Sequence, residues 1–340
     1  MASEQAQSRA IDKLAKKAID ELSFKYNAPH PEKREFLLSI IEQGNDGKQY
    51  EVGLASNGGI IEVIGKKASR KTAFLSMLVA SCFAEDGIYG NIKSRLTDRT
   101  VLWFDTEMTG DDFWYFQKRL HQQCGLDDNH PRLHPINLDY FETSKEKLDV
   151  MLHILRNSNL EDGTGYFQNI GLVILDGIAD LTGDTNNETA CREILESIKN
   201  VLSSMDCCLA TVLHSDKKGQ SSRGTLGTLL DQKATSAIMM DLKNPGEATT
   251  VRPEKIRNGR LFQPYSLEHD IDGTLLINGS PNGLTTNVSS SDFLGDDDNT
   301  KKPVAKKTAP EKKKKVEKTE MKDPLKTIKG DEGDFSDLPF

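Results

Sequence analysis

The residues best suited to chemistry form a short basic segment that contains a glycine, a serine and a lysine–threonine pair. The segment lies between an apolar run, residues 60–64, and a helical pattern over residues 72–83. This order of strand, loop and helix is typical of a phosphate-binding loop, in which backbone N–H groups at a helix N-terminus bind the anion. The predicted ATP-binding residues are Gly65, Lys66, Lys67, Ala68, Ser69, Arg70, Lys71 and Thr72.

Two side chains of this loop have expected roles, and a third departs from the usual pattern. The Lys71 ammonium would neutralise the β- and γ-phosphates, and the Thr72 hydroxyl would bind Mg²⁺. Arg70 stands where the pattern has glycine, which adopts backbone conformations closed to other residues. Either Arg70 tolerates a right-handed version of the loop and adds a charge for the phosphates, or it impairs the site. A basic turn that binds nothing is the remaining alternative.

Three polar residues at the ends of other apolar runs could complete the site. Asp176 follows residues 171–175 and would bind Mg²⁺. Glu107 could polarise the water that attacks the γ-phosphate. His214 would place a titratable side chain beside the same crevice. Each has a plainer alternative: a capping or turn aspartate, a solvated glutamate and a structural histidine.

Basic residues elsewhere indicate contacts with further anions. Lys217, Lys218 and Arg223 lie in a polar, glycine-containing loop that suits the backbone phosphates of single-stranded DNA. A plain solvated loop is the alternative. Lys255 and Arg257 are two residues apart on a predicted strand and therefore share one face. They could reach the nucleotide of a neighbouring subunit and stabilise transition-state charge there.

These residues require a scaffold in which strands and helices alternate. Short apolar runs alternate with helical patterns, which predicts an α/β fold with a mainly parallel sheet covered on both faces. Three later runs are separated only by turn residues and predict an antiparallel extension at one edge. Near the N-terminus, apolar residues three and four apart predict an amphipathic helix. The expected strands are 60–64, 101–104, 172–175, 209–213, 236–242, 249–255 and 264–269, and the expected helices are 9–23, 72–83, 111–124, 144–156 and 188–204.

Charge is unevenly distributed along the 340 residues, whose formal net charge is −8. Residues 1–300 carry −12, residues 301–330 carry +8 and the last ten carry −4. This distribution excludes a protein coated in positive charge, so any nucleic-acid contact must be local. The C-terminal tail, residues 288–340, is poor in large apolar residues, which predicts disorder. The expected domains are an N-terminal helical segment 1–50, a core 51–285, a disordered lysine-rich linker 286–330 and an acidic partner-binding tip 331–340.

Cysteine usage and hydropathy indicate the compartment. The five cysteines form no CxxC pair and are typical of reduced core thiols, which predicts a cytoplasmic protein. The longest mostly apolar run, residues 74–84, is 11 residues long. A membrane-spanning helix needs about 20, so no membrane partner is expected.

With these motifs in this order, the chain resembles the RecA-fold ATPases over about residues 55–280, and most of all the RepA-like and DnaB-like ring helicases of phages and mobile elements. The resemblance implies a RecA-like P-loop core, ATP at subunit interfaces, and hexameric rings or helical filaments around single-stranded DNA. Carried over by position, the catalytic residues are Lys71, Glu107, Asp176, His214, Lys255 and Arg257, the last two acting on an adjacent subunit.

The last ten residues resemble the acidic C-terminal tip of bacterial single-strand-binding proteins. A terminal aromatic side chain could fill an apolar pocket while the flanking acids steer its approach. The resemblance implies that replication or repair proteins bind the tip through Asp334, Phe335, Asp337, Leu338, Pro339 and Phe340.

The expected function is an ATP- and Mg²⁺-dependent motor on single-stranded DNA, a replicative helicase of the RepA-like and DnaB-like kind that acts as a homo-oligomer. Two alternatives remain open. One is a RecA-like recombinase or mediator that forms a filament on single-stranded DNA. The other is a single-stranded-DNA-binding scaffold that does not hydrolyse ATP.

Overall fold

The structure is a computed structural model that describes residues 11–17, 19–20, 35–44, 46–216, 222, 224–244, 246–257 and 259–268, with the backbone alone for 269 and 275–278. The chain divides into two units, Met1–Leu294 and Gly295–Phe340, and every described residue belongs to the first. The predicted linker 286–330 and the predicted tip 331–340 therefore lie outside the described residues.

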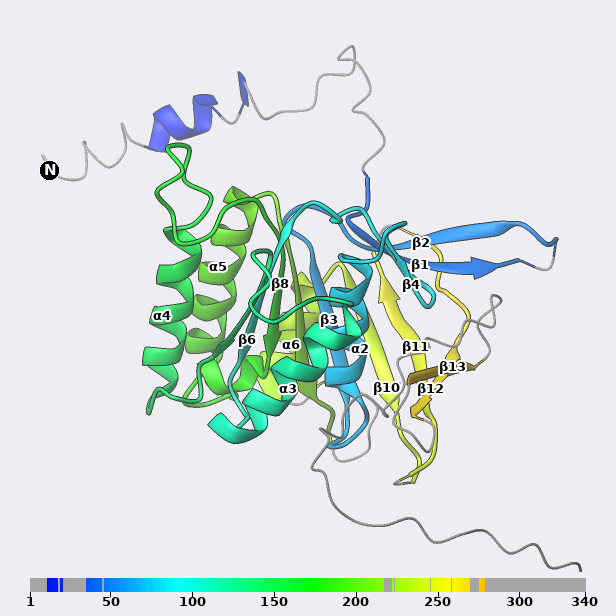
Figure 1. The fold of residues 1–340 in the computed structure, drawn as a ribbon. Helices are drawn as coiled ribbons and strands as arrows, with labels where there is room; N and C mark the ends of the chain where they lie inside the picture. Colours follow the sequence, from blue (N-terminus) through cyan, green and yellow to red (C-terminus); the bar gives the residue numbers. More distant parts are fainter. Residues whose placement is uncertain are drawn as a thin grey trace, which may run out of the picture. The chain divides into compact units, whose positions relative to one another are not determined.

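The main sheet contains nine strands in the described part of the chain (Figure 1). They are β3 (Ile60–Gly65), β6 (Thr100–Asp105), β7 (Leu133–Asn137), β8 (Ile170–Asp176), β9 (Cys208–His214), β10 (Ser236–Asp241), β11 (Thr249–Ile256), β12 (Tyr265–His269) and β13 (Leu275–Asn278). Their spatial order is β13-β12-β11-β10-β3-β9-β8-β6-β7. The six strands from β10 to β7 are parallel, and β11, β12 and β13 extend the sheet antiparallel.

Helices cover both faces of the parallel strands, as their apolar side chains require. Along β6, β8 and β9, alternate residues belong to two separate apolar clusters, one on each face of the sheet. One cluster contains side chains from α2 (Lys71–Ser81) and α3 (Gly110–Gln123). The other contains side chains from α4 (Ser144–Arg156), α5 (Glu188–Ser204) and α6 (Gly224–Lys233).

The N-termini of three helices have side-chain caps that the sequence provides. Thr109 accepts a hydrogen bond from the Asp112 N–H at the start of α3, and Asn187 accepts one from Ala190 at the start of α5. Thr143 and Glu146 form a reciprocal capping box at α4. The predicted starts of these helices agree with the observed ones to within a residue.

The predicted α/β fold with a mainly parallel sheet is confirmed, with three corrections. β10 was expected in the antiparallel extension but is parallel to β3. The reason is α6, a helix that the sequence analysis did not predict and that connects β9 to β10 as a crossover. The short edge strand β7 was also not predicted, because its apolar pattern is weak.

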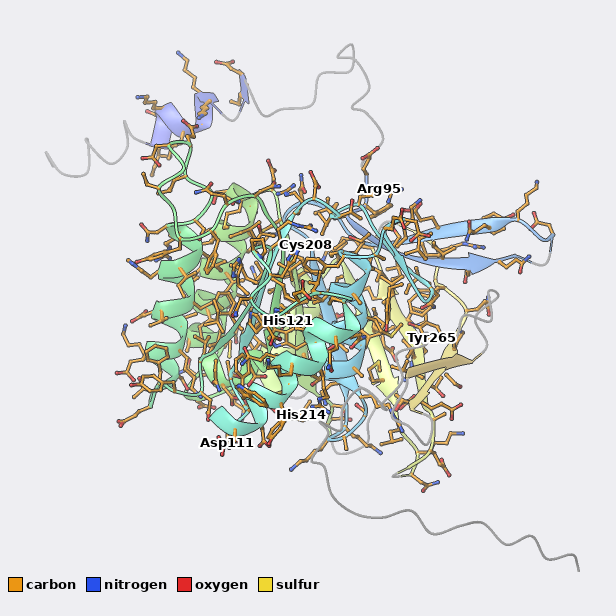
Figure 2. The ribbon with its side chains drawn as sticks, in the orientation of Figure 1. Arg95, Asp111, His121, Cys208, His214 and Tyr265 are labelled. Carbon is orange, nitrogen blue, oxygen red and sulfur yellow. The ribbon has the colours of Figure 1, made fainter. Side chains whose placement is uncertain are left out.

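A second sheet contains four strands in the described part of the chain, in the order β2-β1-β5-β4. It contains β1 (Leu38–Gln43), β2 (Gln49–Ala55), β4 (Ile88–Tyr89) and β5 (Ile92–Ser94). Its apolar side chains join the cluster beneath α2, and Arg95, labelled in Figure 2, binds Glu51 and holds the pKa of that carboxyl at about 2. The expectation that residues 1–50 form a helical segment is therefore wrong for residues 38–43, and a boundary at residue 50 would divide the β1–β2 hairpin.

The N-terminal helix is confirmed only in part. Residues 11–17 are helical, and the apolar side chains of Ile11, Leu14 and Ile19 are exposed in the structure. The rest of the expected range 9–23 lies mostly outside the described residues. None of the described helices is long and apolar enough to cross a membrane.

Candidate functional site

The polar residues at the carboxyl ends of the central strands lie along one edge of the sheet. In the strand register, Gly65 at the end of β3 is opposite His214 at the end of β9. Asp105 at the end of β6 is opposite Asp176 at the end of β8. Figure 2 labels His214 at this edge, whereas Cys208, at the start of the same strand, lies toward the opposite edge. The carboxyl ends of parallel strands are where α/β proteins bind ligands.

The phosphate-loop segment closes tightly over the end of β3. Gly65 permits this closure, because a Cβ there would lie 2.3 Å from the Ser69 hydroxyl and 2.8 Å from the Met240 carbonyl oxygen. Ala68 has a left-handed backbone conformation, with φ 63°. The Ser69 hydroxyl is buried at the centre of the loop without a hydrogen-bond partner.

Arg70 also has a left-handed conformation, with φ 61°, immediately before α2 begins at Lys71. Its guanidinium donates hydrogen bonds to the Glu247 carbonyl oxygen at 2.7 Å and to the Thr249 hydroxyl at 2.9 Å. The expected right-handed version of the loop is therefore wrong. The arginine adopts the backbone conformation that glycine usually supplies. Its guanidinium binds the β10–β11 turn and does not act as the added phosphate ligand that we expected.

Lys71 is buried, and its side chain folds back over the phosphate loop that precedes it. Its ammonium donates to the carbonyl oxygens of Gly65 at 3.2 Å and Lys66 at 2.9 Å. Burial lowers the pKa of Lys71, while the carboxylates of Asp176 and Glu107 raise it. The ammonium is thus held at the centre of the loop with carboxylates in front of it.

Thr72 and Asp176 form a direct contact between the loop and the end of β8. The Thr72 hydroxyl donates to Asp176 Oδ2 at 2.8 Å. Asp176 is buried, and burial raises its pKa to about 7, with the nearby Asp105 and Glu107 carboxyls acting in the same direction. The Thr72 and Asp176 oxygens thus lie side by side, with the Asp105 and Glu107 carboxyls nearby. A hard cation such as Mg²⁺ would stabilise this group of oxygen ligands and negative charges.

Asp105 is a second buried carboxyl at this edge that the sequence analysis did not single out. Its Oδ1 accepts hydrogen bonds from the backbone N–H groups of Glu107 at 3.1 Å and Met108 at 2.7 Å. Its Oδ2 is buried without a partner, and burial raises its pKa to about 6. Asp105 therefore fixes the turn that presents Glu107. The available signal was its position as the last residue of a strand, directly before Glu107.

Glu107 and His214 approach each other across the edge of the sheet. His214 Nε2 lies 3.9 Å from Glu107 Oε1, and both side chains are about half exposed. Burial and the nearby Lys71 charge lower the pKa of His214, which favours the neutral form of the ring. The structure thus brings together Lys71, Thr72, Glu107, Asp176 and His214, all of which the sequence analysis had selected.

The residues present fit a nucleotide with Mg²⁺. The buried, unpartnered Ser69 hydroxyl and Asp105 Oδ2 are polar atoms for which a ligand shell would provide partners. Over the described ranges no cluster of three or more His, Cys, Asp or Glu side chains is arranged to hold a metal ion. A Mg²⁺ ion would be held by Thr72 and Asp176, since this ion takes one or two protein ligands and completes its shell with phosphates and water.

Lys255 and Arg257 lie away from the phosphate loop of their own chain. β11 runs antiparallel to β10, so Lys255 is level with Glu62 in the middle of β3 and Arg257 with the start of that strand, both away from its carboxyl end. Lys255 binds the carbonyl and the carboxylate of Asp231, and Arg257 donates to the Gln232 carbonyl, both at the end of α6. The structure does not join them to the other five residues, and their expected action on a neighbouring subunit stays a prediction.

The three predicted DNA-binding residues, Lys217, Lys218 and Arg223, lie outside the described residues. The two sides of their loop are described: Ser215 pairs with Ser222 in an antiparallel bridge. The loop therefore begins directly after His214, next to the candidate nucleotide site, and ends where α6 begins.

The strand–loop–helix with a buried lysine, together with the hydrogen bond between Thr72 of α2 and Asp176 at the end of β8, defines a P-loop nucleotide-binding domain. An AAA domain is recognised over residues 48–220, about half of the chain. The protein belongs to this family and contains an AAA-type ATPase domain. No curated protein matches the chain significantly.

Proposed function

We propose that the protein is an ATP-driven motor on single-stranded DNA, a replicative helicase of the RepA-like and DnaB-like kind. The observation that carries the proposal is the convergence of Lys71, Thr72, Asp176, Glu107 and His214 at one sheet edge, directly beside the start of a basic loop. A loop with Lys217, Lys218 and Arg223 suits contacts with DNA phosphates.

In this proposal each residue of the site has one task. Lys71 and the loop N–H groups would hold the phosphates of ATP, and Thr72 and Asp176 would hold Mg²⁺. Bound Mg-ATP supplies the phosphoryl transfer that powers the motor. Glu107, presented by Asp105, would orient and deprotonate water, and the neutral His214 would form a hydrogen bond with Glu107 or with a phosphate oxygen. Lys255 and Arg257 would serve the site of an adjacent subunit.

The proposal is tested by ATP-dependent unwinding of a forked DNA duplex. We expect the full chain to separate the strands with ATP and Mg²⁺, and the Lys71→Ala variant to fail. The matched control is Lys199→Ala, which removes an exposed lysine of α5 far from the site.

The other outcomes of this assay are informative. Single-stranded-DNA-stimulated hydrolysis without unwinding, together with open filaments in electron micrographs, would favour the recombinase or mediator. Nucleotide binding without turnover would favour the scaffold that does not hydrolyse ATP. The observation that supports this alternative is Arg70, which occupies the usual glycine position of the phosphate loop.

A further inference from the structure

Glu62 is a fully buried carboxyl in the middle of β3, the strand that carries the phosphate loop. Its neighbours Ile61 and Val63 face the cluster beneath α2, so Glu62 faces the opposite side of the sheet, where α6 packs. Its Oε1 accepts a hydrogen bond of 2.6 Å from the Ser222 hydroxyl, and its Oε2 has no partner. A buried carboxyl with one hydrogen bond is costly where an apolar side chain would pack well.

Ser222 is held from two further directions. It forms the antiparallel bridge to Ser215. It also lies against Gly227 of α6 so closely that a Cβ at Gly227 would be 2.4 Å from the Ser222 Cβ. Ser222 is therefore a fixed point between the basic loop and α6.

Both sides of the basic loop are fastened to β3. On one side the Ser215 N–H donates to the Gly65 carbonyl oxygen at 3.2 Å, which also accepts from the Lys71 ammonium. On the other side Ser222 donates to Glu62, three residues earlier on the same strand. The strand that ends in the phosphate loop thus holds the two described ends of the loop that contains Lys217 and Lys218.

The charges around Glu62 come from two other elements. Asp231 of α6 disfavours its ionisation, whereas Lys255 of β11 favours it. Ser222, Asp231 and Lys255 also line a polar cavity of about 430 Å³ beside this cluster. The cluster therefore joins β3, α6, β11 and the basic loop at one point.

We propose that Glu62 is a positioning residue that acts through Ser222: it fixes this described end of the basic loop against the strand of the phosphate loop and so transmits DNA binding to the nucleotide site. This inference rests on the proposed function, because it assigns the loop a DNA-binding role.

The test uses full-length Glu62→Leu, Glu62→Gln and Ser222→Ala. Leucine removes the hydrogen bond and puts an apolar side chain in the buried position, whereas glutamine retains an oxygen that accepts from Ser222. The first readout is tryptic cleavage after Lys217, Lys218 and Arg223, mapped by mass spectrometry. The second is the ratio of ATPase rates with and without single-stranded DNA.

We expect Glu62→Leu and Ser222→Ala to be cleaved about fivefold faster than wild type, the factor by which loss of one hydrogen bond shifts a local opening equilibrium. The DNA stimulation ratio should fall by a similar factor while the rate without DNA stays unchanged. Glu62→Gln should stay within about twofold of wild type in both readouts. The double variant, Glu62→Leu with Ser222→Ala, should show the same cleavage rate and stimulation ratio as either single variant, because both substitutions remove the same contact.

Wild-type cleavage and wild-type stimulation in both Glu62→Leu and Ser222→Ala would overturn the inference, as would fully additive effects in the double variant. If Glu62→Leu does not fold, Ser222→Ala alone decides the result. If the wild-type protein shows no DNA stimulation, the proposed function fails. In that case the cleavage rate of Ser222→Ala still tests the contact between Glu62 and Ser222, and a wild-type rate would show that this contact does not hold the loop.

Discussion

Arg70 shows how a single side chain adapts the phosphate loop to an unusual sequence. A left-handed backbone costs a non-glycine residue about 1–2 kcal/mol. In this chain the cost is offset by two hydrogen bonds from the guanidinium to the β10–β11 turn. The loop can thus keep the backbone shape of a glycine-containing loop, at the expense of a dependence on residues 247–249.

The consequence for stability is specific. Arg70→Ala loses both hydrogen bonds and keeps the strained backbone, whereas Arg70→Gly loses the bonds but relieves the strain. We expect the glycine variant to be more stable than the alanine variant by about 1 kcal/mol, measured by urea unfolding. Equal stabilities would show that the left-handed conformation at this position is not the source of strain.

At Glu107 the prediction concerns chemistry alone. Glu107→Gln keeps the size of the side chain and removes the proposed general base, so ATP turnover should fall about 10²- to 10⁴-fold. Nucleotide affinity should change little, because Lys71 and Thr72 remain. The matched control is Glu161→Gln, an exposed glutamate in a loop away from the site; a turnover loss of the same size in that variant would contradict the assignment.

At the scale of elements, β3 with its loop and α2, and β6 and β8 with the turns after them, position the site. The turn after β8 depends on Gly177, whose φ is 104° and whose added Cβ would lie 2.2 Å from the Thr106 hydroxyl. That hydroxyl donates to the Gly177 carbonyl oxygen at 2.9 Å and so joins the ends of β6 and β8. The spacing between Asp105 and Asp176 is therefore fixed by this side-chain hydrogen bond as well as by the strand register.

This dependence can be tested with two glycines. Gly177→Ala should lower the free energy of unfolding by about 2–3 kcal/mol, because it combines backbone strain with a steric clash. Gly183→Ala is the control, since an added Cβ there has no atom within 4 Å, and a change of at most about 0.5 kcal/mol is expected. Similar losses in both variants would contradict the prediction.

β3 also carries a pH-sensitive group. Burial raises the pKa of Glu62 to about 7 from an ordinary value of 4.5. Between these values the unfolded chain releases a proton that the folded chain keeps, so Glu62 makes the folded state less stable as pH rises through this window. The thermal midpoint of Glu62→Gln, relative to wild type, should therefore increase from pH 5 to pH 8. Parallel curves would show that Glu62 does not titrate in this range.

The sequence predicted those elements whose signals are local. β3, α2, β8 and α5 combine a periodic apolar pattern with recognisable ends, and the residues that follow the strands converge because parallel strands share an edge. The four-stranded sheet was not predicted, because β1 pairs with β5, a short strand far along the chain. The left-handed Arg70 and the role of Glu62 could not be predicted either, since their partners, Glu247 and Ser222, are more than 150 residues away.

At the scale of the whole molecule, the described core contains a P-loop domain of the AAA family over residues 48–220, a range that includes three strands of the small sheet, and it continues into the antiparallel strands β11 to β13. Lys255 lies on β11, Arg257 directly follows it, and both lie away from the nucleotide site of their own chain. If they serve a neighbouring subunit, the active form is an oligomer in which this strand faces another phosphate loop. Under the proposed function, the net charge of −8 describes a mainly acidic body, and we expect DNA contacts only at the basic loop and the lysine-rich stretch 301–330.

The most direct test of the central claim is the rate of ATP hydrolysis by the full chain, measured with Mg²⁺ in the presence and absence of single-stranded DNA, for wild type and Lys71→Ala. Our account predicts hydrolysis that single-stranded DNA stimulates and that Lys71→Ala abolishes. A rate that is unaffected by DNA and by Lys71→Ala would contradict it.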